Sequence, residues 1–347
     1  MKIGKPGRTL MEGIFRQTGA RNPKVRQGPR SGVDTSLVEI DKKVMISSMD
    51  PVSLIPEIGP EKSAKLSVHG IASDVATSSI QPRFAMFDLN LPPSLTDRTL
   101  QVYWRSIHQT CLALGISIVG GHTGRFPGCD YTVIGGAVMW CFSSPDEYVS
   151  SAMAKPGDDL ILTKSAAIEA TAVLASSFPN TVERSLGVEV LDKARRMINR
   201  ATVVQEAAAA ASVGIRQNGV TAMHDVTEGG VVSAILDLAE ASRLKATIEE
   251  ESIPVFDEVR QVCELFHLDP LKSLGQGCLV IASRPNRTNV ILQRLGRSRI
   301  PASLVGTLSK KVGHSAIRKG NKESRMARPK ADPYWNVYWK AVRSKLR

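Results

Sequence analysis

Strand-like and helix-like segments are interleaved along the chain without a regular strand–helix–strand rhythm, and this order restricts the fold most. β-prone runs occur near 35–40, 44–48, 84–91, 116–119, 131–142, 160–163, 219–223, 245–249, 278–283 and 302–307. Helical patterns occur near 61–79, 96–115, 167–178, 188–212, 229–243, 255–265 and 286–296. A doubly wound sheet would place one helix between successive strands, so the sequence favours two α+β domains.

A segment rich in helix- and strand-breaking residues separates the two halves. Between residues 143 and 158 lie Pro145, Pro156 and Gly157. We place the domain boundary there, because 347 residues suffice for two domains of ordinary size. The predicted organisation is a basic segment at 1–30, a first domain at 31–150, a second domain at 155–310 and a basic extension at 311–347.

Composition excludes several classes of protein. The chain is 42% hydrophobic and 22% charged, which is typical of a folded protein. It lacks the apolar run of roughly 18 residues that a membrane helix needs and the apolar core of a signal peptide. We therefore expect a cytoplasmic protein with no membrane partner. The five cysteines form no CxxC pair, which argues against a cysteine-based metal site or a disulfide framework.

Positive charge is concentrated at the two ends of the chain. Of the net charge of +12, residues 1–30 contribute +7 and residues 310–347 contribute +10, while residues 31–309 carry −5. Such ends could bind nucleic acid or an acidic partner. No RNP, zinc-finger or helix-turn-helix pattern accompanies them, so we favour solvated ends and keep nucleic-acid binding as a less favoured hypothesis.

Four aspartates lie at the ends or breaks of the predicted elements. They are Asp34 at the entry of the first strand, Asp50 at the end of the second, Asp74 inside the first helix and Asp225 at the end of a later strand. Any one of them could simply cap or turn the chain, although a buried carboxylate in a helix needs a partner. Magnesium prefers oxygen ligands and usually joins carboxylates to substrate phosphates. Converging aspartates therefore predict a magnesium site.

Two glycine pairs are candidates for the other half of a phosphate site. Gly120 and Gly121, followed by His122 and Thr123, come after an apolar strand and are predicted to break it as a turn. Gly229 and Gly230 are predicted to open a helix. Glycine lets backbone N–H groups approach an anion closely, and a helix start adds a favourable dipole. Each pair alone is a weak signal, and no Walker A, Rossmann or protein-kinase motif is present.

Taken in order, these motifs resemble those of the aminoimidazole ribonucleotide synthetase-like, or PurM-like, superfamily. It includes selenophosphate synthetase, thiamine-monophosphate kinase and the hydrogenase maturation factor HypE. The resemblance covers roughly residues 28–310 and rests on the segments 32–34, 48–50, 70–76, 120–128 and 224–230. The nearest likeness is to the AIR synthase-related, HypE-like group.

The resemblance implies a two-domain PurM-like fold, whose N-terminal β-sheet domain binds ATP and forms a homodimer and whose C-terminal domain is α+β. It implies that the magnesium ligands are Asp34, Asp50, Asp74 and Asp225, of which Asp34, Asp74 and Asp225 are also the candidate catalytic residues. The candidate nucleotide contacts are Gly120, Gly121, His122, Thr123, Gly229 and Gly230. Family reactions place phosphate on an oxygen or selenium nucleophile.

Departures from the family pattern leave the activity open. The first acidic motif has Val33 beside Asp34 where the family has two acids, and Glu228 replaces an arginine of HypE. The reactive cysteines of HypE and selenophosphate synthetase have no counterpart. Our first hypothesis is ATP- and magnesium-dependent phosphoryl transfer, or ATP hydrolysis, on a small molecule or a protein-borne carbonyl or carboxyl group. The alternatives are an ATP-binding maturation or regulatory factor with a protein partner, and a nucleic-acid-binding protein.

Several single residues carry weaker predictions. Lys164 is expected to be solvated, with a phosphate contact as the alternative, and Glu169 to complement a helix dipole. His122 is assigned equally to a phosphate or ribose contact and to a structural turn, and His224 to orienting the loop of Asp225. An aromatic cluster in the basic tail is predicted to form a strand or short helix docked on the second domain; its members are Tyr334, Trp335, Tyr338 and Trp339.

Overall fold

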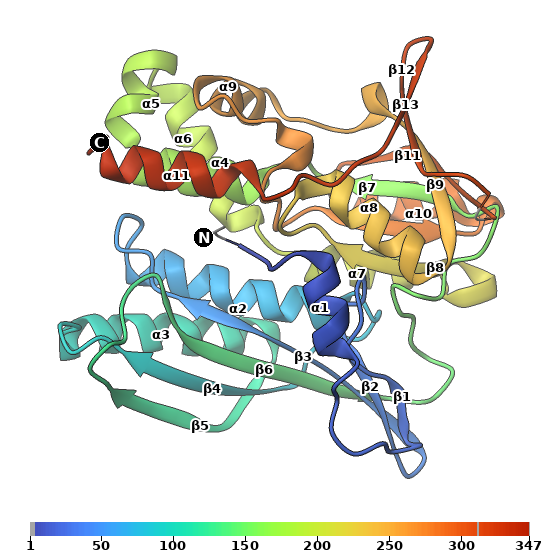
Figure 1. Ribbon diagram of the computed structural model, residues 1–347, viewed down its shortest axis with the longest axis horizontal. Coiled ribbons are helices and arrows are strands. Elements are labelled where there is room, and N and C mark those ends of the chain that lie inside the picture. The colour runs from blue at the N-terminus through green and yellow to red at the C-terminus, as the bar shows by residue number, and fades with distance from the viewer. Residues whose placement is uncertain (1–3, 311, 347) are drawn as a thin grey trace.

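The computed structural model describes residues 4–310 and 312–346, which form two β-sheets with helices packed against them (Figure 1). Sheet A has six strands from the first half of the chain, and sheet B has seven strands from the second half. The two parts share one of the three hydrophobic clusters, because Ile161 and Met223 of sheet B join the cluster of sheet A. The predicted α+β class is confirmed.

Sheet A has one covered face and one open face. Its strands are β1 Val25–Gln27, β2 Ser36–Ile40, β3 Lys43–Ser53, β4 Phe84–Leu91, β5 Ser117–Arg125 and β6 Val133–Ser143, in the spatial order β1-β2-β3-β6-β4-β5. Helices α2 Pro60–Ala76 and α3 Asp97–Leu114 cover one face (Figure 1). Alternate strand residues such as Ile46 and Phe87 are buried against these helices. The opposite face exposes large apolar side chains.

Sheet B is more deeply buried. Its strands are β7 Asp159–Thr163, β8 Val220–Asp225, β9 Leu244–Glu249, β10 Leu279–Ser283, β11 Ala302–Lys310, β12 Ala316–Lys319 and β13 Lys322–Arg325, in the order β13-β12-β9-β11-β7-β10-β8. Every residue of β8 and β10 is buried, because helices pack on both faces. The α-helices other than α2 and α3 are α1 Arg8–Phe15, α4 Ile168–Ser177, α5 Pro179–Leu186, α6 Val188–Arg196, α7 Val204–Ala211, α8 Gly230–Ala241, α9 Asp257–Leu265, α10 Pro285–Arg297 and α11 Pro333–Arg343.

The helix ends show how local sequence sets the boundaries. Thr96 caps α3, since its side-chain oxygen accepts a hydrogen bond from the Thr99 backbone N–H at 3.2 Å. Gly115 ends the same helix in the left-handed conformation, with φ of 69°. Both predictions are confirmed. None of the described helices combines the length and hydrophobicity that a membrane span requires.

The aromatic tail forms α11, which docks on the second half of the molecule beside α4 (Figure 1). Tyr334 and Tyr338 are buried, and the ring of Tyr338 lies 5.9 Å from the ring of Phe178. Aromatic side chains at this helical spacing bury a large apolar area on one face. The prediction of a docked helix is therefore confirmed.

The long helix predicted at 188–212 is wrong, because the chain breaks it between α6 and α7. A 3-10 turn at Met197–Arg200 follows α6, and α7 begins at Val204. The ammonium of Lys164 donates hydrogen bonds to the backbone carbonyls of Arg200 and Thr202, at 2.9 and 2.5 Å. It also pairs with Glu206 at 2.7 Å. Both expectations for Lys164, as a solvated or a phosphate-binding residue, are therefore corrected.

Two predicted strand boundaries are also wrong. Strand β3 continues past Asp50 to Ser53, so Asp50 lies inside the strand, with Pro51 on an otherwise paired ladder against β6. Strand β5 runs through Gly120 and Gly121 instead of turning there. A Cβ at Gly121 would lie 2.0 Å from the Phe87 carbonyl oxygen, so the close approach of β4 requires glycine.

Candidate acidic site

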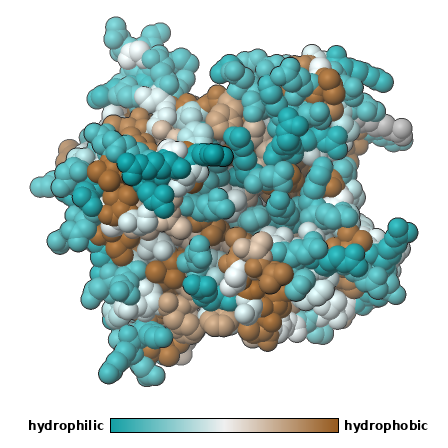
Figure 2. All heavy atoms as spheres, turned by 180° about the vertical axis from the view of Figure 1, so that it is seen from behind, coloured by the Kyte–Doolittle hydropathy of each residue, from teal (hydrophilic) through white to brown (hydrophobic). Residues whose placement is uncertain are grey.

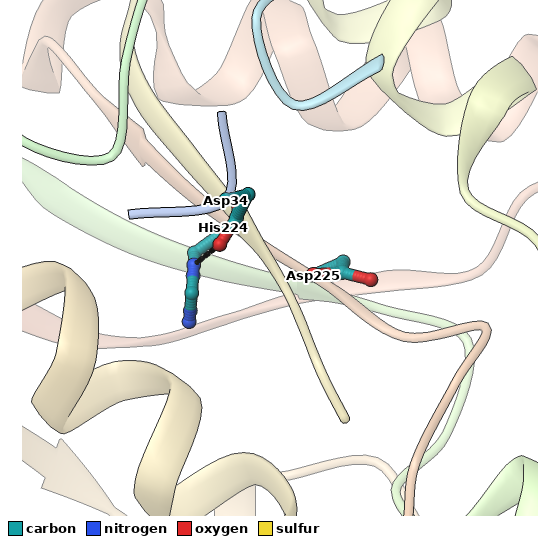
Figure 3. Close-up of side chains that lie close together, drawn as sticks. All are labelled: Asp34, His224 and Asp225. Atoms are coloured by element: carbon teal, nitrogen blue, oxygen red, sulfur yellow. Dashed lines mark ion pairs between the residues drawn. The ribbon is translucent and has the colours of Figure 1, made fainter. Parts of the chain in front are cut away.

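Three side chains from distant parts of the sequence meet at the junction of the two sheets (Figure 3). Asp34 comes from the segment before β2, and His224 and Asp225 come from the end of β8. One ligand atom of each residue lies within 4.8 Å of the others. A strand from the second half thus completes a site that begins near the N-terminus.

Asp34 is held on both sides. One carboxylate oxygen forms an ion pair with His224 Nδ1, and Ser151 Oγ donates a hydrogen bond to the other at 3.2 Å. The second ring nitrogen of His224 lies 3.9 Å from a carboxylate oxygen of Asp237. Burial opposes the charge on His224, but Asp34 and Asp237 outweigh it and raise the pKa of His224 well above its ordinary value. His224 therefore orients Asp34 across the junction.

Asp74 of helix α2 is not one of these three residues, but the charges of Asp225 and Asp34 act on its carboxyl. Asp74 is only 9% exposed, and the hydroxyl of Ser48 on β3 donates a hydrogen bond to its carboxylate at 2.7 Å. Burial raises the pKa of Asp74 well above its ordinary value, and the charges of Asp225 and Asp50 add to this effect. A buried carboxylate in a helix was expected to need a hydrogen-bond partner, and for Asp74 that partner is Ser48 of the neighbouring strand.

Asp225 has an unused oxygen. The residue is 3% exposed, and its Oδ2 has no hydrogen-bond partner among the described residues. Burial raises the pKa of Asp225 to about 7, and the charge of Asp34 contributes. An uncompensated carboxylate is costly inside a protein unless a cation or donor meets it. The carboxylates therefore fit a bound divalent ion such as magnesium, for which oxygen ligands are preferred.

Asp50 also lies outside this group of three. Desolvation in the cleft raises its pKa, whereas the positive charge of Lys5 lowers it. Its position on β3 follows the buried residues Val44 and Ile46 at even spacing, so its side chain shares their face of sheet A. The structure thus brings Asp34 and Asp225 within ligand distance of each other, together with His224. Asp50 and Asp74 are not in this group of three, and only their charges connect them to it. Their role as magnesium ligands stays a prediction.

Lys5 was missed by the sequence prediction. Its backbone N–H donates to Glu228 at 3.0 Å, and its side chain lies in the field of the acidic group. Desolvation lowers the pKa of Lys5, but Asp50 and Glu228 raise it above its ordinary value. A lone lysine in a basic terminal segment gives no sequence signal for such a position, because it depends on how the segment folds back.

The basic ends are therefore only partly solvated, which corrects that prediction. Arg328 pairs with Asp237 at 2.7 Å and with Glu240 at 3.0 Å, and Arg8 also pairs with Glu240. Arg328 and Asp237 each keep the other charged: burial opposes this for Asp237, yet His224 and Arg328 lower its pKa to about 2. Both ends thus neutralise acidic residues next to the site.

The first glycine motif lies away from the acidic group. Gly120 to Thr123 lie on β5 at the edge of sheet A, separated from β3 by β6 and β4, or roughly 14 Å at the usual strand spacing. His122 stacks on Phe126 with ring centroids 6.2 Å apart.

Gly229 and Gly230 lie next to Asp225 in sequence, at the start of α8. The Gly229 N–H donates to Asp332 at 2.7 Å, and the Gly230 N–H donates to the Thr227 carbonyl at 3.2 Å. These N–H groups are engaged within the protein. The roles of both glycine motifs in binding nucleotide stay predictions.

Comparison with known proteins identifies the family. The N-terminal domain of AIR synthase related proteins matches residues 32–140, and their C-terminal domain matches residues 155–319. The chain belongs to the AIR synthase related family. Within it, the chain falls in the PurM-like, HypE-like group that the motif order indicated.

Relatives in two organisms illustrate this membership. A putative hydrogenase expression/formation protein of Methanocaldococcus jannaschii is 26% identical over 250 residues, or 72% of this chain and 70% of that protein. Carbamoyl dehydratase HypE of Escherichia coli K12 is 25% identical over 317 residues, or 89% of each chain. The crystal structure of E. coli HypE has a TM-score of 0.72 at 23% identity, covering 95% of this chain and 99% of HypE.

Two further HypE structures share the fold. HypE in a HypE–HypF complex has a TM-score of 0.72 at 18% identity, covering 93% of this chain and 100% of that one. HypE in complex with ATP has a TM-score of 0.64 at 20% identity, covering 96% and 97%. At these identities the likeness establishes the fold of this AIR synthase related protein.

Proposed function

We propose that this AIR synthase related protein binds magnesium and ATP at the acidic site and transfers phosphate, or hydrolyses ATP, on a small molecule or a protein-borne carbonyl or carboxyl acceptor. The meeting of Asp34 and Asp225 at one place, with an oxygen of Asp225 left without a partner among the described residues, carries the proposal. A HypE relative has been crystallised with ATP, which supports the same ligand here.

Each residue of the site has a role in this proposal. Asp34, Asp50, Asp74 and Asp225 would hold magnesium. Magnesium, when bound, offsets the charge of the phosphates and orients them for in-line attack. His224 and Ser151 fix the carboxylate of Asp34, while Ser48 fixes that of Asp74. The ammonium of Lys5 supplies a positive charge next to Asp50 for the phosphates.

Incubation with Mg-ATP tests the proposal directly. We expect a higher melting temperature in Mg-ATP than in either component alone, because a ligand that binds only the folded state stabilises it. ADP release should be followed in parallel with candidate acceptors. If Mg-ATP does not stabilise the protein and no ADP is released, the proposed function is contradicted.

Magnesium binding is expected to strengthen as pH rises. The pKa of Asp225 is raised from 3.8 to about 7, so protons compete with the metal below that pH. Without metal, the stability associated with this group is fully present below about pH 4 and is lost as pH rises towards 7. Titration calorimetry at pH 6 and pH 8 should therefore give tighter magnesium binding at the higher pH, and equal affinities would contradict the assignment.

The open face of sheet A supports the proposed homodimer. Met49 is 70% exposed and Met86 is 42% exposed, and both pair with Val138 of β6 in the sheet register. Hydrophobic residues also gather in the lower half of the opposite view (Figure 2). A contiguous apolar face of this kind marks a protein–protein interface. A second copy seated there would also cover β5, with its predicted nucleotide contacts.

Charging this face should abolish the dimer. We expect the double substitution Met49→Asp and Met86→Asp to give a monomer in light scattering, since two carboxylates would have to be buried in the interface. Val188→Asp on α6, at a residue that is 60% exposed, serves as a control outside sheet A. A dimer that persists in the double variant would show that the interface lies elsewhere.

A maturation or regulatory factor is the second candidate. The specific support is the HypE relative crystallised with HypF, which is a protein partner. Affinity capture with and without ATP separates the two candidates, because a nucleotide-controlled factor should change its partners. Nucleic-acid binding is less favoured, since Lys5, Arg8 and Arg328 face acidic residues of the protein itself.

A further inference from the structure

A cavity lies beside Asp50, between the two halves of the molecule. It has a volume of about 130 Å³ and lies between β3, α2, α4 and α11. Asp50, one of the predicted magnesium ligands, lines the cavity. Cavities of about 150 Å³ hold a benzene molecule, so this space suits a small organic molecule and is too small for a nucleotide.

The charge of the lining is one-sided. Asp50 and Glu169 contribute carboxyl groups, whereas no lysine, arginine or histidine is among its described lining residues. A third carboxylate, Glu57, accepts a hydrogen bond from the hydroxyl of Tyr338 in the wall, at 2.8 Å. The charge of Lys5 acts at the Asp50 end of the cavity, but no described basic residue lines the cavity beside Glu169. A cation at the Glu169 end would therefore be attracted, whereas an anion would oppose ionisation of that carboxyl.

Glu169 lies in the first turn of α4 and was predicted only to complement the helix dipole. Burial raises the pKa of Glu169 to about 8, and Asp332 contributes to the same effect. Its carboxyl is therefore largely protonated at neutral pH, which weakens the predicted dipole role. A cation bound beside it would favour the ionised form, because an opposite charge lowers the pKa of a carboxyl.

Aromatic side chains of α11 form another wall of the cavity. They are Tyr334, Trp335 and Tyr338. The indole N–H of Trp335 donates to Glu228, and the rings of Tyr334 and Tyr338 stack with centroids 5.6 Å apart. These contacts hold the rings in place before any ligand arrives. Fixed aromatic faces combined with carboxylates are the usual means of recognising organic cations.

We propose that this cavity binds a small organic cation, held between the carboxyl of Glu169 and the aromatic side chains of α11. Its position next to Asp50 would make this molecule the phosphate acceptor, a part of the inference that rests on the proposed function. A hydroxyl oxygen of the cation would bond to the γ-phosphorus of ATP while the β,γ-bridging P–O bond breaks, ADP leaves and the hydroxyl proton passes to solvent. Binding of the cation itself requires neither magnesium nor ATP. The cavity would reject acceptors that already carry phosphate or carboxylate groups inside it.

Three probes of similar size and different charge test the inference. Benzylamine, benzyl alcohol and benzoate should be titrated into the full-length protein without nucleotide, using calorimetry up to about 20 mM, since ligands of this size bind weakly. We expect saturable binding of benzylamine, weaker binding of benzyl alcohol and none of benzoate. Equal or tighter binding of benzoate, or no detectable binding of benzylamine, overturns the inference.

Two variants place the binding in the cavity. Glu169→Gln should weaken benzylamine about tenfold, because it removes a charge-assisted contact, and should leave benzyl alcohol within about twofold. Glu183→Gln, which changes an exposed residue of α5, should leave both unchanged. Unaltered benzylamine binding in folded Glu169→Gln protein rules the cavity out.

Stabilisation by Mg-ATP, measured on the same samples, separates this result from the proposed function. Benzylamine binding without stabilisation by Mg-ATP would retain the cation site and remove its role as an acceptor site.

Discussion

Asp225→Asn is expected to remove the stabilisation by Mg-ATP and to lower any magnesium-dependent ADP release by at least about 100-fold, the usual loss when one group that stabilises transferred charge is deleted. Asparagine keeps the shape of the side chain but cannot carry negative charge. The oxygen that lacks a partner in the wild type, Oδ2 of Asp225, would no longer attract a cation.

The same substitution should not harm the metal-free protein. Burial raises the pKa of Asp225 to about 7, so ionising this carboxyl at neutral pH costs folding free energy. We therefore expect the metal-free melting temperature of Asp225→Asn to equal or exceed that of the wild type. A variant that loses ligand response while gaining intrinsic stability is typical of a binding residue, not of a structural one.

Asp41→Asn is the matched control. Asp41 is exposed in the turn between β2 and β3 and has a positive φ of 53°, which asparagine tolerates well. Its melting temperature and its response to Mg-ATP should both match the wild type. If Asp225→Asn still responds to Mg-ATP like this control, the proposed metal site is in the wrong place.

Lys164→Met is expected to destabilise the fold by about 3–5 kcal/mol, the usual cost of removing one member of a buried ion pair. Lys164 and Glu206 have side chains that are each 6% exposed and lie 2.7 Å apart. Burial lowers the pKa of Lys164, and Glu206 opposes that shift. Without the ammonium, Glu206 would be a buried carboxylate with no counter-charge, and two backbone carbonyls would lose their donor.

Urea unfolding measures this effect, and two further variants interpret it. Adding Glu206→Leu to Lys164→Met should recover part of the loss, because the unpaired charge is removed while the carbonyls of Arg200 and Thr202 stay without their donor. Lys193→Met, in an exposed pair with Glu189 at 2.7 Å, should leave the midpoint of urea unfolding close to that of the wild type. Equal losses for Lys164→Met and Lys193→Met would contradict a special role for burial.

Local patterns predicted most of the elements. The cap at Thr96, the helix end at Gly115 and the strand that closes at Asp225 depend on neighbouring residues, which the sequence displays directly. The family followed from the order of motifs, since each motif answers a local requirement of the same fold. The meeting of Asp34 and Asp225 could also be anticipated, although only as an implication of that resemblance.

Long-range contacts were beyond prediction. The break before α7 depends on Lys164, which lies roughly forty residues earlier in the chain. The path of β5 through Gly121 depends on the close approach of β4. Lys5 reaches Glu228 and the acidic group only because the N-terminal segment folds back onto the second half of the molecule. Such contacts join residues whose separation leaves no periodicity to detect.

The sequence by itself determined the α+β class, the family and the carboxylates of the candidate site, because propensity, capping and motif spacing are properties of short segments. Only the tertiary structure decided which charges are paired, which oxygen of Asp225 stays without a donor and where a cavity opens beside Asp50. Desolvation and Coulomb energy depend on the distances between folded segments, and those distances are absent from a linear chain.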